Sequence, residues 1–90
     1  MITHEPRGLR IKRAVAAEWQ AWDRATERRA DAEYALEQFE ESPERHNLSE
    51  GGNEEWRETL RVAIRKAVEQ EREAERVWRE ARDRAEAEII

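Results

Sequence analysis

The sequence predicts an all-α protein: an antiparallel, coiled-coil-like hairpin of two long helices that pairs with a second hairpin into a four-helix bundle. Two stretches of nearly equal length, 9–41 and 53–90, contain neither glycine nor proline. These two residue types are the least favourable in helix interiors, so their absence indicates two uninterrupted helices. The segment between them is short, which favours an antiparallel return.

Composition supports the same fold class. Charged residues make up 43% of the chain and hydrophobic residues 38%, many of them alanine. A chain rich in Ala, Glu and Arg with helical periodicity is typical of long helices and coiled coils. Low hydrophobicity with a net charge of -5 is also typical of disordered chains. The four tryptophans favour a folded chain, and 90 residues suffice for one domain, 1–90.

The first helix is expected over residues 7–41. At about 1.5 Å per residue it would be about 50 Å long. It begins with basic residues and ends with acidic ones, the reverse of what the helix macrodipole favours. In a hairpin, the basic start would lie beside the acidic end of the second helix, at Glu86 and Glu88.

Residues 42–53 are expected to form the turn. Ser42 followed by Pro43 is a helix-start pattern, and Gly51-Gly52 provides backbone freedom. Asn53 is expected to cap a second helix over 54–89. The alternative is a loop with a function of its own, but each unusual residue here already has a structural role.

Both predicted helices have a wide apolar arc with an alanine edge and a bulky edge. If the alanine edges face each other, the bulky edges remain exposed and form an interface with a second hairpin. Alternatively, the helices rotate so that one hairpin shares its bulky residues internally. The interface is predicted at Ile11, Val15, Trp19, Trp22, Leu36, Leu60, Ile64, Val68 and Trp78.

Three polar residues, Glu18, Arg29 and Glu71, fall inside the apolar arcs. Arg29 and Glu71 both lie near the middle of their helices, so an antiparallel hairpin can pair them. Such a pair would fix register and partner choice at some loss of stability. Alternatively, the long side chains reach out to water.

The loop end of the hairpin is predicted to be acidic. Three interpretations are open for this acidic tip: a solvated end, a docking surface for a basic protein, or a metal site. The metal site has the weakest basis, because neither EF-hand spacing nor a Glu-x-x-His pattern is present. The residues of the predicted acidic tip are Glu37, Glu40, Glu41, Glu54, Glu55 and Glu58.

The sequence argues against several functional classes. It has no cysteine, no phosphate-binding glycine loop, and no histidine with a neighbouring Ser, Thr or Cys placed as an activated nucleophile, so we expect no enzyme, no cofactor and no metal. The acidic net charge disfavours nucleic acid and anionic membranes as partners. No apolar run could span a bilayer and no signal peptide is visible, so a cytoplasmic protein is expected.

Two functional hypotheses remain. The first is a non-enzymatic interaction module that self-associates, with a homodimer as the expected state. The second is a small acidic inhibitor or adaptor that binds a host protein through its apolar edge or its acidic tip. A self-associating protein buries its tryptophans alone, whereas an adaptor buries them only with its target.

Overall fold

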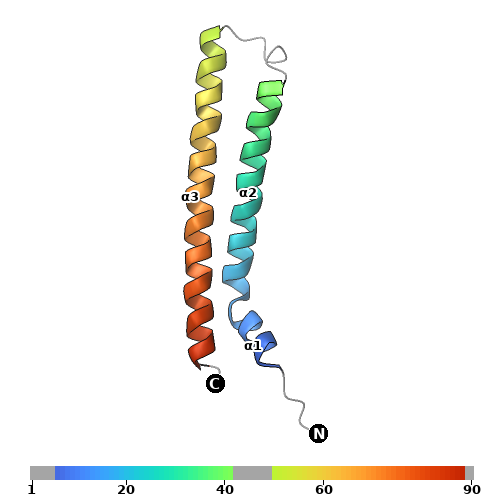
Figure 1. Ribbon diagram of the computed structural model, residues 1–90, viewed down its shortest axis with the longest axis vertical. Coiled ribbons are helices and arrows are strands. Elements are labelled where there is room, and N and C mark those ends of the chain that lie inside the picture. Colours follow the sequence, from blue (N-terminus) through green and yellow to red (C-terminus); the bar gives the residue numbers. More distant parts are fainter. Residues whose placement is uncertain (1–5, 42–49, 89–90) are drawn as a thin grey trace.

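A computed structural model of the chain describes residues 6–41 and 50–88, all but the flanking residue Pro6 and the junction at Val15 helical. The helices are α1 (Arg7–Ala14), α2 (Ala16–Glu41) and α3 (Glu50–Glu88). Figure 1 shows α2 and α3 side by side and antiparallel, with α1 at the end of the rod where α3 finishes. The molecule measures 70 × 23 × 13 Å. The predicted all-helical hairpin is thus confirmed.

The first helix is not continuous, contrary to the prediction for residues 7–41. Val15 separates α1 from α2, with φ -113° and ψ 16°. Helical hydrogen bonds continue across the break: the Val15 N–H donates to the Ile11 carbonyl at 3.1 Å. The Val15 side chain is 4% exposed and clusters with Ala81 and Ala85 of α3. Burial of this β-branched side chain against α3 accompanies the bend, so tertiary packing overrides the local helical pattern.

The second long helix begins earlier than expected. It starts at Glu50, so Asn53 lies within its first turn and is not the N-cap. Glycine can adopt helical dihedrals at about 1 kcal/mol per residue, so the two glycines do not prevent the added turn. Within the described chain, the buried Asn53 Oδ1 has no hydrogen-bond partner. The predicted caps at Ser42 and Pro43 lie outside the described residues.

A single seam joins α2 and α3. The seam positions are buried or half-buried and are spaced alternately by three and four residues, as in a coiled coil. They combine members of both predicted edges, so the expected separation into an alanine contact and a bulky outer edge is wrong. Large and small side chains together fill the space between two helices better than two alanine rows would. The seam residues are Glu18, Trp22, Ala25, Arg29, Ala32, Leu36 and Phe39 on α2, and Leu60, Ile64, Ala67, Glu71, Ala74, Trp78, Ala81 and Ala85 on α3.

Two contacts set the register of the seam. The rings of Trp22 and Trp78 have centroids 5.0 Å apart, and Arg29 pairs with Glu71. Each step of seven residues along α2 thus corresponds to seven residues back along α3. The next such step places Leu36 level with Ile64.

The core of this hairpin is thin. The buried apolar residues are small, apart from Val15 and Phe39, and the larger seam side chains are only half-buried. In a two-helix hairpin each seam side chain is covered only by the one helix that faces it. The two sides of the seam therefore stay accessible to solvent. The buried residues described are Val15, Ala25, Phe39, Ala67, Ala81 and Ala85.

Candidate interaction surfaces

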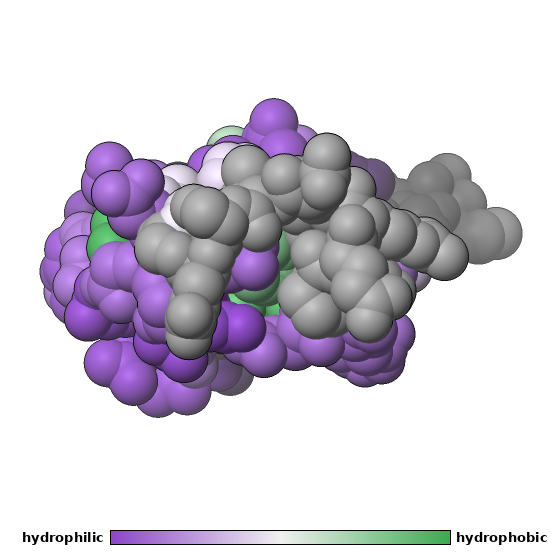
Figure 2. Space-filling view, turned by 90° about the horizontal axis from the view of Figure 1, so that it is seen from above, coloured by the Kyte–Doolittle hydropathy of each residue, from purple (hydrophilic) through white to green (hydrophobic). Residues whose placement is uncertain are grey.

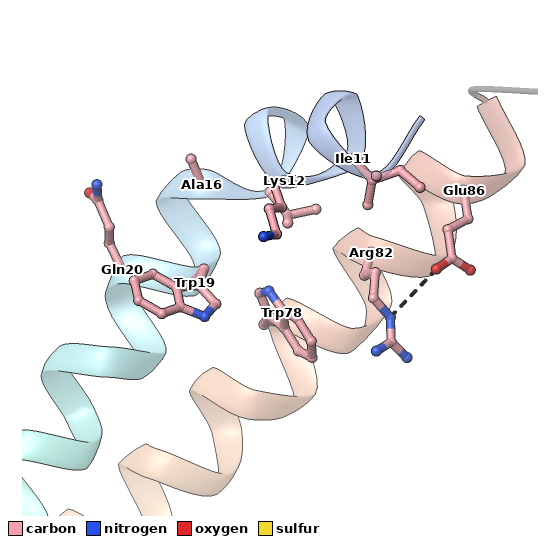
Figure 3. A pocket seen from close by; sticks show the side chains of 10 residues that line it. Ile11, Lys12, Ala16, Trp19, Gln20, Trp78, Arg82 and Glu86 are labelled. Atoms are coloured by element: carbon pink, nitrogen blue, oxygen red, sulfur yellow. Dashed lines mark ion pairs between the residues drawn. The ribbon is translucent and has the colours of Figure 1, made fainter. Parts of the chain in front are cut away.

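A groove of about 600 Å³ lies where α1, α2 and α3 meet, beside the break at Val15. Figure 3 shows Trp19 of α2 and Trp78 of α3 in the space between these helices, with α1 beside them. Ile11, Val15 and Ala16 add apolar surface to the lining. The groove therefore lies at the break in the chain at Val15, which the sequence pattern did not reveal.

Polar groups surround this apolar lining. Lys12, Gln20, Arg82 and Glu86 contribute to the groove. The Arg82 guanidinium lies 4.9 Å from the centroid of the Trp78 ring, and its Nε is 3.9 Å from a Glu86 carboxylate oxygen. Among the described residues, the buried Trp78 Nε1 has no acceptor. The groove thus has an apolar floor surrounded by hydrogen-bond donors and by one carboxylate acceptor, Glu86.

Two rows of residues flank the seam on the side of the groove. Residues spaced by seven share a row on a helix of a coiled coil. One row on α2 includes Trp19, and one row on α3 includes Arg82; since both residues line the groove, both rows lie on the same side of the hairpin. We call this side the groove face. Its rows are Trp19, Thr26, Glu33 and Glu40 on α2, and Glu54, Arg61, Val68, Glu75 and Arg82 on α3.

The predicted interface residues divide between these features. Most of them contact the other helix of their own hairpin or lie in the seam, so they are not a surplus outer edge. Trp19 is 50% exposed and lies in the groove outside the seam. Whether any of them contacts a second chain stays a prediction. The seam or its terminal cluster contains Ile11, Val15, Trp22, Leu36, Leu60, Ile64 and Trp78, while Trp19 and Val68 flank it.

The acidic tip is partly neutralised from within. Arg57 of α3 donates to Glu40 of α2 at 2.7 Å and also pairs with Glu54. Its guanidinium lies 5.6 Å from the centroid of the buried Phe39 ring. Arg65 pairs with Glu58 at 3.0 Å. Seen from this end, the described surface is mainly hydrophilic, with hydrophobic residues visible between the helices (Figure 2).

Exposed carboxylates remain at the tip. Glu37, Glu41 and Glu55 are all exposed. The described residues contain no cluster of His, Cys, Asp or Glu that could hold a metal ion.

The polar pair predicted in the seam is present. Arg29 donates from Nε to Glu71 at 2.5 Å and from Nη1 to Glu33 at 3.0 Å. The hydrogen bond to Glu71, followed by that to Glu33, raises the pKa of Arg29 above its ordinary value. Arg29 therefore stays charged and joins the two helices near their middle.

Comparison with known proteins returns no family to which the chain can be assigned. No family model matches it, and no curated protein or solved structure is significantly similar. None of the helices in the described ranges is long and apolar enough to cross a membrane.

Proposed function

We propose that this chain is a non-enzymatic interaction module that self-associates, with two hairpins packing face to face into a four-helix bundle. The observation that carries the proposal is the half-buried seam. Its large side chains, Trp22, Leu36, Ile64 and Trp78, are covered by one neighbouring helix and remain accessible at the sides. A second hairpin would bury these sides, as in four-helix bundles.

The exposed area supports the same arrangement. A compact protein of 10.7 kDa exposes about 5,500 Å² by the usual scaling of surface with mass. This chain exposes 7200 Å². The excess of about 1,700 Å² follows from the elongated shape of the rod. The long sides therefore offer more than the roughly 800 Å² that each partner loses in a standard stable interface. Small domains with thin cores usually need such a supplement to be stable.

The test is the solution mass over a concentration series, measured by sedimentation equilibrium. The expected result is a dimer, at twice the 10.7 kDa of the chain. Trp19→Ala removes a half-exposed side chain of the groove face and should raise the dissociation constant about tenfold, the equivalent of about 1.4 kcal/mol.

Tyr34→Ala is the matched control. Tyr34 is 61% exposed and lies two residues from both Ala32 and Leu36, which places it on the side of α2 away from the seam. This variant should keep the dissociation constant of the natural sequence. A monomer at every concentration would contradict self-association. In that case the adaptor hypothesis, in which the same face binds another protein, becomes the better proposal.

A further inference from the structure

The two ends of the rod have opposite charge. Residues 7–14 of α1 include four basic side chains and no acidic one, while residues 33–41 of α2 include four glutamates and no basic residue. These segments lie at opposite ends of the molecule (Figure 1). Both placements oppose the helix macrodipole, which favours acidic residues at the start of a helix and basic residues at its end.

The groove face shows the same polarity. At the α1 end it holds the apolar groove, whose charged lining is two cations, Lys12 and Arg82, and one carboxylate, Glu86. Toward the tip, the same rows hold Glu33 and Glu40 on α2 and Glu54 on α3, against one cation, Arg61. Within the hairpin, Arg29 pairs with Glu33, and Arg57 pairs with Glu40 and Glu54, so the second copy would share these carboxylates. A second copy turned end to end therefore brings carboxylates toward the cationic groups of the groove.

We infer that the second copy packs antiparallel on the groove face, so that the acidic tip of each hairpin lies over the basic end and groove of the other. This inference rests on the self-association proposed above and specifies the partner's orientation. Charges are screened beyond about 8 to 10 Å at physiological salt, whereas the rod is 70 Å long. Each end therefore interacts only with the charges next to it.

A parallel dimer would place like ends together. The basic α1 segments would then be neighbours, and so would the acidic ends of α2. Like charges in contact oppose association, and complementary ones select orientation and register. The antiparallel arrangement also covers the apolar groove at both ends of the dimer, because a two-fold axis makes the contact reciprocal.

Orientation can be measured directly with spin labels. The chain has no cysteine, so a single introduced cysteine gives one label per copy. Ala17→Cys and Gln38→Cys are suitable because both positions are exposed and, three heptads apart, share a row about 32 Å long. Distances between labels in the dimer are read by double electron–electron resonance.

One sample gives the distance between the two labels at position 17, and the other gives the distance between the two labels at position 38. In an antiparallel dimer the mean of these two distances along the rod axis is about 32 Å, wherever the two-fold axis lies between the labelled positions. In a parallel dimer, both like-labelled pairs lie side by side, at about the 10 Å spacing of neighbouring helices plus the label arms. Short distances for both like-labelled samples would overturn the inference and leave self-association standing. A monomeric mass would overturn both proposals.

A charge reversal tests the electrostatic basis. Lys12→Glu should weaken the dimer about threefold or more, in line with the loss of exposed ion pairs, and the loss should shrink in high salt. Lys66→Glu is the matched control: it makes the same change in net charge near the middle of α3 and should have a smaller effect. Adding Glu37→Lys to Lys12→Glu should recover affinity.

That recovery requires the tip of one copy to lie near α1 of the other. Equal weakening by both lysine variants, or no recovery in the double variant, would overturn the antiparallel arrangement. The concentration series still reports whether a dimer forms, so the two proposals fail separately.

Discussion

Arg29 of α2 hydrogen-bonds through Nε to Glu71 of α3 at 2.5 Å and joins the two long helices near their middle. Together with the Trp22–Trp78 contact it places the helices in one register. Shifting α3 by one heptad would separate Arg29 from Glu71. Both side chains are partly buried, and each would lose its charged partner on the other helix. A charged pair inside an apolar seam thus favours one alignment over its neighbours.

Glu71→Gln should lower the thermal unfolding midpoint because it removes the charge that Arg29 faces across the seam. Glu33→Gln is the matched control, since Glu33 also bonds Arg29 but belongs to the same helix and is more exposed. The Glu33 variant should lower the midpoint less. Circular dichroism at one protein concentration measures both thermal unfolding midpoints. Equal midpoints for the two variants would show that the cross-helix pair does not hold the hairpin in register.

Trp22→Ala should destabilise the hairpin by about 2 to 4 kcal/mol, since truncation of large core side chains costs about 3 to 5 and Trp22 is only half-buried. The Trp22–Trp78 ring contact would also be lost. Trp56→Ala, which removes an indole that is 44% exposed, should change stability less. Urea denaturation of both variants at matched concentration provides the comparison, and similar losses would show that the Trp22–Trp78 contact is not special.

Gly8→Ala should stabilise α1 by about 0.5 to 1 kcal/mol, because alanine is the better helix former. A Cβ at Gly8 meets no atom within 4 Å, so no packing is disturbed. Hydrogen exchange of the α1 amides is the direct measurement, and it should slow in the variant. Unchanged exchange would mean that α1 is held by its contacts with α3 and not by helix propensity.

Glu73→Gln should remove a small, pH-dependent part of the stability. The hydrogen bond from Arg76 lowers the pKa of Glu73 below its ordinary 4.5. A lowered pKa in the folded state contributes stability above pH 4.5 and loses it as the pH falls below that value. The natural protein should therefore be slightly more stable than the variant at pH 7, and the two should converge in stronger acid. Thermal midpoints at a series of pH values would show this, and a constant difference at all pH values would contradict it.

The sequence alone determined the helical content and the hairpin. The absence of glycine and proline from 9–41 and 53–90 predicted the long helices, and the apolar arcs predicted that they pack together. It also predicted the Arg29–Glu71 pair, because antiparallel helices of similar length bring their middles together. These features follow from local propensity and periodicity, which a sequence contains in full.

Tertiary structure decided how the helices face each other and where α1 bends. The periodicity of the sequence identifies a broad apolar face on each helix. Only packing against the other helix determines which residues of that face form the contact, such as Trp22, Ala25 and Arg29. Local pattern likewise gave no sign of the break at Val15, which accompanies burial of its side chain against Ala81 and Ala85. The groove beside Trp19 and Trp78 lies at that bend. Its position depends on contacts between residues more than sixty positions apart, which local sequence patterns do not record.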